Sequence, residues 1–290
     1  MAESAKLAFK AYEIEELVDI YFYRRLGYVV AVAARALRLT PNMVSVLAGV
    51  AGAIGGAFIA WPHLALIGVG LMILHGVIDS ADGQLARMTG QTSELGRILD
   101  GLAGYATYIA MYIAIVAIVR DAWGLGPAVA AAFVSGFFTA LQAQMYDYYR
   151  TAYAAYVLKG RIPTELRTPQ AGGPLAPVIR FYAWMQQALL GLHRTVEDGI
   201  IARAGGGQVL TADRDRYRAC FYRPVRGWNL LGDNVRRYAI LVLVLVQRPA
   251  WFIPFTIGAM NLVVVLLWLY QQAADRRFLA ADARAARHTR

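Results

Sequence analysis

The most chemically distinctive residues of this chain are three aspartates in otherwise apolar segments, Asp79, Asp82 and Asp100. Asp79 and Asp82 are three residues apart, so in a helix they share one face. Asp100 lies about one turn into the next predicted helix, and an antiparallel hairpin would bring all three carboxylates together. Clustered acids repel one another unless cations lie among them, and ionisable residues at membrane depth mark functional sites. The cluster therefore predicts a site for one or two metal ions, and its oxygen ligands favour Mg²⁺ or Mn²⁺ over zinc.

Small residues and an arginine accompany the three acids. Gly83, Ala86 and Gly96 leave room for a ligand to approach the backbone, and the guanidinium of Arg87 suits a phosphate group. Together with a divalent metal, these residues predict a phosphate-bearing ligand. The alternative is that the acids pair with Arg87 and Arg97 in an ion network that only packs helices.

The composition is that of an integral membrane protein. Of its 290 residues, 58% are hydrophobic and only 17% are charged, whereas a soluble domain carries about 25% charged residues. Several apolar runs approach the roughly 20 residues that a helix needs to cross the hydrocarbon core. The net charge of +10 fits positive-inside loops and anionic head groups. Nucleic acid is therefore not expected as a partner.

The predicted fold is all-α, a polytopic membrane helix bundle of six transmembrane helices preceded by an N-terminal interfacial amphipathic helix. The spans are expected at residues 43–61, 64–88, 97–119, 125–149, 229–247 and 250–274. The chain then divides into the interfacial segment 1–38, transmembrane helices 1–4 within 39–149, a cytoplasmic or interfacial insertion at 150–228, transmembrane helices 5 and 6 within 229–275, and a basic cytoplasmic tail at 276–290. The arginine distribution places both termini and the acid cluster on the cytoplasmic side, and a bacterial inner membrane is expected.

The acid-rich segment resembles the signature of the CDP-alcohol phosphotransferase (CDP-alcohol phosphatidyltransferase) family. That signature reads Asp-x2-Asp-Gly-x2-Ala-Arg-x8-Gly-x3-Asp-x3-Asp, and all of its positions except the last match in register: Asp79, Asp82, Gly83, Ala86, Arg87, Gly96 and Asp100. The Thr40-Pro41-Asn42 segment at the start of the first predicted span is also similar to that family.

This resemblance implies transfer of a phospho-alcohol from a CDP-linked donor to a hydroxyl acceptor, with release of CMP, in the synthesis of phospholipids or related head groups. Asp79, Asp82 and Asp100 would be catalytic and hold metal against the diphosphate. The cytidine nucleotide would be lined by Asn42, Gly83, Ala86, Arg87 and Gly96. At least one substrate is expected to be a lipid: CDP-diacylglycerol is the favoured donor, and a CDP-linked polar alcohol with a lipid acceptor is the reverse arrangement. The resemblance also suggests a homodimer.

The last aspartate of the signature is replaced by Gly104. In the family that position is associated with the second metal and with deprotonating the acceptor hydroxyl, and glycine can do neither. Three interpretations stay open: an active transferase with an altered site, a degenerate member that binds CDP-linked nucleotide or lipid without turnover, and an engineered knock-out. In the first, a substitute is sought in His75, on the same helix face as Asp79, or in Asp147. A lone histidine in a spanning helix is also commonly a hydrogen-bonded packing residue.

Charged and aromatic residues outside the signature carry further expectations. Arg236 and Arg237 are predicted near the inner membrane face, where they could bind the phosphate of a lipid or acceptor or anchor the helix by snorkelling. In the insertion, Glu197 and Asp213 are expected to form solvated pairs with arginines. Trp228 is expected to be an interfacial anchor.

Overall fold

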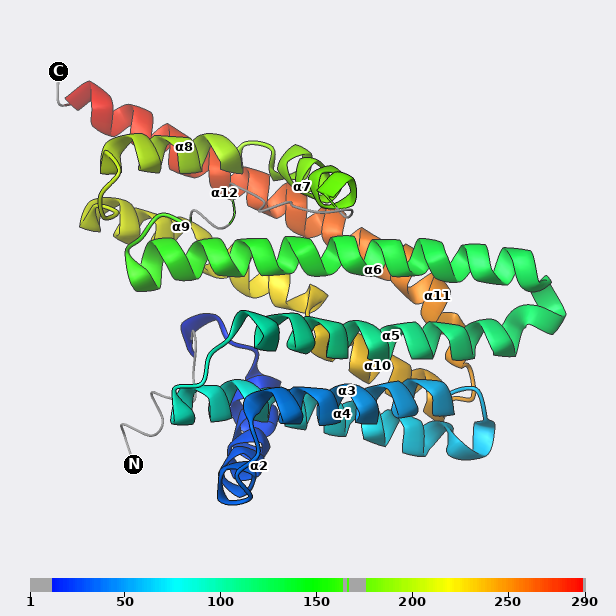
Figure 1. Cartoon of the computed structure of the whole chain (residues 1–290). Coiled ribbons are helices and arrows are strands. Elements are labelled where there is room, and N and C mark those ends of the chain that lie inside the picture. Colours follow the sequence, from blue (N-terminus) through cyan, green and yellow to red (C-terminus); the bar gives the residue numbers. More distant parts are fainter. Residues whose placement is uncertain (1–11, 164–165, 167–175, 289–290) are drawn as a thin grey trace. The chain divides into compact units, whose positions relative to one another are not determined.

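The computed structural model describes residues 12–163, 166 and 176–288, and the described residues form helices and turns with no strand (Figure 1). The predicted all-α fold is therefore confirmed. The chain divides into two compact units. The first comprises the residues up to Phe138 together with Asp233–Gly258, and the second comprises Thr139–Gly232 together with the residues from Ala259 on.

Among the described residues, five helical segments are long and apolar enough to cross a membrane: Pro41–Phe58, Pro62–Thr89, Ile98–Trp123, Leu125–Lys159 and Pro249–Arg284. They identify an integral membrane protein with several spans. The predicted span at 229–247 corresponds to α10 (Asp233–Leu245), which has only 13 residues. At about 1.5 Å per residue, α10 is roughly 20 Å long, less than the hydrocarbon core of about 30 Å. Six crossings therefore stay a prediction.

The first unit is built around α3, α4 and α5, three helices that lie nearly parallel in Figure 1, with α3 packing on both α4 and α5. Its elements are η1 (Tyr12–Ile14), η2 (Asp19–Tyr23), α2 (Arg24–Ala36), α3 (Pro41–Phe58), α4 (Pro62–Thr89), α5 (Glu94–Trp123), the start of α6 (Leu125–Tyr153), α10, η6 (Pro249–Trp251), α11 (Phe252–Pro254) and the start of η7 (Phe255–Met260).

Glycines let α3 approach its neighbours closely. A Cβ added at Gly52 would clash with the hydroxyl of Thr107 in α5. A Cβ added at Gly55 would lie 2.6 Å from the carbonyl oxygen of Gly68 in α4. Small residues at such contacts are typical of helices packed in a membrane. Because α3 packs closely on both α4 and α5, it holds the end of α4 next to the start of α5.

The turn between α4 and α5 is defined by local sequence. Gly90 ends α4 with a φ of 68°, a left-handed conformation that favours glycine. Ser93 caps α5, since its hydroxyl accepts a hydrogen bond of 2.9 Å from the backbone N–H of Gly96. Thr40 caps α3 in the same way, with Pro41 at the first helical position. The starts of α3 and α5 are thus both fixed beside the end of α4.

The predicted N-terminal amphipathic helix is present as α2, although residues 1–11 of the segment 1–38 lie outside the described residues. Its buried face, which includes Gly27, Ala31 and Ala34, packs on α4. Its opposite face leaves Val29 and Val32 exposed. Figure 1 shows α2 crossing the direction of α3 and α4, as a helix lying along a membrane surface would. Its place in the interface stays a prediction.

The second unit is also helical. It comprises the rest of α6, η3 (Ala154–Lys159), α7 (Ala176–Leu190), α8 (His193–Ala204), α9 (Thr211–Trp228), η5 (Asn229–Leu231), the end of η7 and α12 (Asn261–His288). The segment predicted as the tail 276–290 continues α12 as far as His288, so the part of it that the structure describes is helical.

Within this second unit, two expectations for the insertion are wrong. Glu197 is 2% exposed and accepts a hydrogen bond of 2.7 Å from the Tyr148 hydroxyl, so it is not in a solvated pair. Asp213 is paired with Arg203 as expected, but it is only 3% exposed. Trp228 is fully buried and stacks on Tyr149, so it is not an interfacial anchor. The partners Tyr148 and Tyr149 come from α6. The local composition of the insertion therefore does not predict these contacts.

Candidate metal centre

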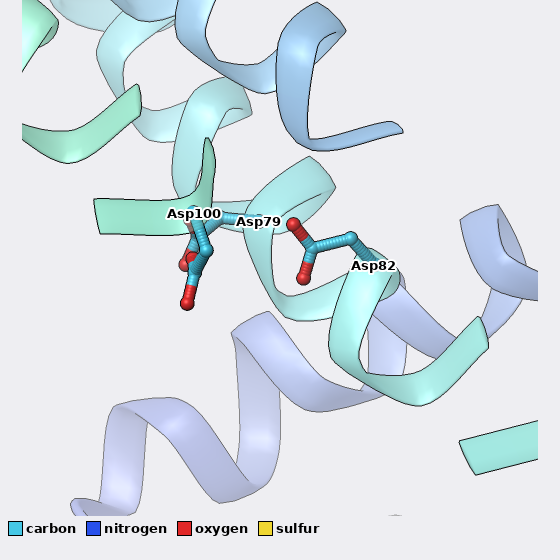
Figure 2. Close-up of side chains that lie close together, drawn as sticks. All are labelled: Asp79, Asp82 and Asp100. Carbon is cyan, nitrogen blue, oxygen red and sulfur yellow. The ribbon is translucent and has the colours of Figure 1, made fainter. Parts of the chain in front are cut away.

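The three aspartates converge as predicted. One carboxylate oxygen from each of Asp79, Asp82 and Asp100 lies within 4.8 Å of the others. Figure 2 shows Asp79 and Asp82 projecting from α4 toward Asp100 of α5. The three differ in exposure, since Asp82 is 6% exposed, Asp79 is half-buried and Asp100 is exposed. The cluster therefore reaches from the helix interface to the surface.

This donor set fits a hard divalent cation. Three carboxylates at such short separation repel one another without a positive charge among them. Carboxylate oxygens with no nitrogen or sulfur ligand are the preference of Mg²⁺ and Mn²⁺. Asp79, Asp82 and Asp100 are thus the residues that would hold the ion, with the exposed Asp100 on the side from which a ligand would arrive.

Ser45 of α3 is a member of the site that the sequence interpretation missed. Its hydroxyl is 2.5 Å from Oδ2 of Asp82 and 3.2 Å from the carbonyl oxygen of Pro41, and it is 3% exposed. The shorter contact is the hydrogen bond that Ser45 donates to the carboxylate. This bond holds the buried acid against α3. The sequence feature that could have indicated this role is the spacing of Ser45, which lies one helical turn after Asn42.

The residues expected around the nucleotide lie close to the acids. Asn42 at the start of α3 packs on Gly96 of α5, where an added Cβ would lie 2.9 Å from the amide oxygen. Gly83 faces Arg87, whose Nη1 would lie 3.5 Å from a Cβ at that position. Ala86 is half-buried on α4. Asn42 therefore contacts Gly96 between α3 and α5, and Gly83 lies beside Arg87 on α4.

His75 is part of the α3–α4 packing. It is 3% exposed, and its Nδ1 lies 2.9 Å from the carbonyl oxygen of Ala48 in α3. Since a carbonyl only accepts, Nδ1 carries the proton and donates it. The ring is not among the groups whose ligand atoms converge with the acids. This arrangement is the hydrogen-bonded packing role that was the alternative for His75.

The two arginines of α10 are buried, Arg236 at 1% and Arg237 at 7% exposure. Arg237 forms a 2.6 Å ion pair with Asp233 and lies over the ring of Tyr23. A Cβ added at Gly76 in α4 would clash with its guanidinium. Arg237 is therefore held inside the first unit by its own partners. Binding of a lipid or acceptor phosphate by Arg236 and Arg237 stays a prediction.

Gly104, which replaces the last aspartate of the signature, lies beside open space. Gly104 lies one helical turn after Asp100 on α5, and a Cβ added there would meet no atom within 4 Å. An aspartate at this position would therefore fit without displacing a neighbour. The other substitute considered, Asp147, belongs to the second unit, whereas the acid cluster belongs to the first. The side chain of Arg97, expected in the alternative ion network, lies outside the described residues.

Comparison with known proteins gives one finding. A family model described as CDP-alcohol phosphatidyltransferase matches residues 38–191, more than half of the chain. The matched region contains α3, α4 and α5, and with them every residue of the acid cluster. A search of curated proteins found no match.

Proposed function

Because the chain belongs to the CDP-alcohol phosphatidyltransferase family, we propose that it moves a phospho-alcohol from a CDP-linked donor to a hydroxyl acceptor and releases CMP. The product would be a phospholipid or a related head group. The observation that carries this proposal is the convergence of Asp79, Asp82 and Asp100 at the α4–α5 turn. A packing contact does not require three carboxylates, and burying them without a cation costs stability.

Each part of the site has a defined task in this reaction. A divalent ion bound by the three acids would neutralise the diphosphate of the donor and help CMP to leave. Arg87 donates to a phosphate oxygen, and Gly83 lets the nucleotide approach the backbone of α4. Ser45 orients Asp82 through the hydrogen bond described above. Loose phosphoryl-transfer transition states need positioning and charge neutralisation above all, and these residues provide both.

The donor we favour is CDP-diacylglycerol, with a small polar alcohol as acceptor. The cluster lies at the ends of segments that qualify as membrane spans, so a diphosphate carried by a lipid would reach it from the bilayer surface. A CDP-linked polar alcohol with a lipid acceptor uses the same residues. We also propose that Mg²⁺ or Mn²⁺ is required, that the site faces the cytoplasm, and that the protein acts as a homodimer.

The test is the pair of variants Asp79→Asn and Asp100→Asn. We expect both to abolish metal-dependent CMP release while the protein still expresses and folds, because an amide cannot replace a charged metal ligand. Asp121→Asn is the matched control, since Asp121 is an exposed acid near the other end of α5. If the two cluster variants change only thermal stability, with no metal dependence of any property, the acids are a packing network.

The second candidate function is binding without turnover, and Gly104 is the observation that favours it. A non-catalytic member would bind a CDP-linked compound in a metal-dependent manner and release no CMP. Titration calorimetry with CDP and Mg²⁺, run beside the CMP assay on the same preparation, separates the two candidates.

A further inference from the structure

The face of α5 that carries Gly104 leads to a second carboxylate. Asp100, Gly104 and Tyr108 recur at intervals of four residues, so they lie on one side of the helix. The hydroxyl of Tyr108 donates a hydrogen bond of 2.7 Å to Oδ1 of Asp233, the first residue of α10. The carboxylate of Asp233, from a distant part of the chain, is therefore bound by a residue on the same face of α5 as Gly104.

Tyr108 lies one helical turn after Gly104 on α5. A Cβ added at Gly104 would meet no atom within 4 Å, so the space beside that turn is open. The side chain of Asp233 is 49% exposed, so a substrate hydroxyl could approach the Tyr108–Asp233 pair.

Arg237 connects this pair to the acid cluster. It binds Oδ2 of Asp233 at 2.6 Å, and its guanidinium fits against Gly76, which is one turn before Asp79 on α4. Arg237 therefore links Asp233 to the turn of α4 that precedes Asp79.

We propose that Tyr108 and Asp233 together replace the carboxylate that Gly104 lacks and accept the proton of the acceptor hydroxyl. This inference rests on the proposed transferase function. The acceptor oxygen bonds to the donor phosphorus, and the bond from that phosphorus to the CMP oxygen breaks, with its electron pair leaving on CMP. The acceptor proton passes to the oxygen of Tyr108 while the proton of Tyr108 passes to Asp233, which later releases it to water.

The three residues have separate parts in this step. Tyr108 contacts the acceptor and is the catalytic residue. Asp233 acts through Tyr108, and Arg237 holds Asp233 in place, so both are positioning residues. Two donors to Asp233, a hydroxyl and a guanidinium, keep it in the carboxylate form that can receive a proton.

The first test removes the two groups one at a time. We expect Asp233→Asn and Tyr108→Phe each to lower kcat for CMP release about 100-fold, the lower range of general-base effects, with metal-dependent donor binding unchanged. The matched control is Tyr112→Phe, because Tyr112 is one turn further along α5 and its hydroxyl hydrogen bonds with Ser135, away from the acids. Wild-type kcat in either test variant would overturn the proposal.

The second test is a rescue that a merely structural role would not produce. Gly104→Asp restores the signature carboxylate in open space, so in the Asp233→Asn background we expect it to recover most of the lost kcat. If the double variant binds donor and metal but stays as slow as Asp233→Asn, the proposal is wrong. Absence of CMP release from the wild type with every donor would instead contradict the proposed function, on which this inference depends.

Discussion

Asp82 is a buried acid that a residue of a neighbouring helix holds in place. It is 6% exposed and accepts a hydrogen bond from the hydroxyl of Ser45. A hydrogen bond to a charged group contributes about 1.5–3 kcal/mol, and leaving such a group without its donor costs at least as much. Ser45 thus orients Asp82, a residue that would bind the metal.

We predict that Ser45→Ala raises the metal concentration needed for half-maximal CMP release by about 10- to 100-fold, the usual range for partners of metal ligands. Without its donor, Asp82 loses both orientation and charge stabilisation. The measurement is a Mg²⁺ or Mn²⁺ titration of activity. Ser135→Ala is the control, because Ser135 is also buried and hydrogen bonded but lies elsewhere in the first unit. An unchanged metal requirement in Ser45→Ala would contradict this role.

The acid cluster could be predicted from sequence because its geometry is local. Asp79 and Asp82 share a helix face by spacing alone, and a short turn after Gly90 returns the chain to Asp100. Ser45 and Asp233 could not be predicted in this way. Ser45 lies 37 residues from its partner, and Asp233 lies 125 residues from Tyr108. Such pairs depend on which helices pack together, which the spacing of residues in one segment does not determine.

At the scale of elements, α8 is joined to α12 by a buried histidine. Nδ1 of His193 lies 2.7 Å from Oδ1 of Asp275, and its Nε2 lies 3.0 Å from the hydroxyl of Tyr217 in α9. Burial lowers the pKa of His193, but the hydrogen bond and charge of Asp275, together with the charge of Glu197, raise the pKa above its usual value. The imidazolium therefore contributes to the stability of the second unit.

We predict that the melting temperature of the protein falls as the pH rises above about 6.5, the usual pKa of an unfolded histidine. A raised pKa means that the stabilisation is complete below that pH and is lost as the pH rises through the folded-state pKa. One proton changes the free energy of unfolding by at most about 1.4 kcal/mol per pH unit. Thermal melts in detergent between pH 6 and 9 measure the slope.

In His193→Gln the protein should be less stable, and this pH slope should become shallower because the titrating group is gone. His63→Gln is the control, since His63 is exposed at the start of α4 and should leave the slope intact. An identical slope in wild type and His193→Gln would show that His193 does not titrate in this range.

The elements themselves were predicted to different degrees. The apolar runs and the break at Pro41 locate α3, α4 and α5 within a few residues of their observed bounds. Burial within the insertion is harder to predict from sequence, because Glu197 and Trp228 are buried by contacts with α6. The predicted span at 229–247 is shorter as α10, because Gly232 separates it from η5 and the polar residues Asp233 and Asn234 begin it.

At the scale of the whole molecule, the central expectation is that the chain crosses the membrane with its acid cluster facing the cytoplasm. The α4–α5 turn and the α5–α6 connection lie at opposite ends of α5, a helix of 30 residues. At about 1.5 Å per residue, such a helix is long enough to cross the hydrocarbon core. Thr92 is exposed in the first connection, and the side chain of Asp121 is 91% exposed beside the second.

Labelling of single cysteines tests this orientation. Cys220 is the only cysteine, so a Cys220→Ser background is free of thiols. We predict that a membrane-impermeant maleimide added to intact cells labels Asp121→Cys and does not label Thr92→Cys, whereas permeabilised cells show both labelled. Labelling of Thr92→Cys alone in intact cells would reverse the orientation and place the site outside.

The measurement that most directly tests the central claim is CMP release by the purified protein in detergent with Mg²⁺ or Mn²⁺. CDP-diacylglycerol, CDP-choline, CDP-ethanolamine and CDP-glycerol would be offered in turn with pooled hydroxyl acceptors. We predict CMP release from one donor, abolished by chelation and absent in Asp79→Asn. No CMP from any donor, with metal-dependent binding of a CDP compound intact, would contradict it and identify a binding protein built on the transferase fold.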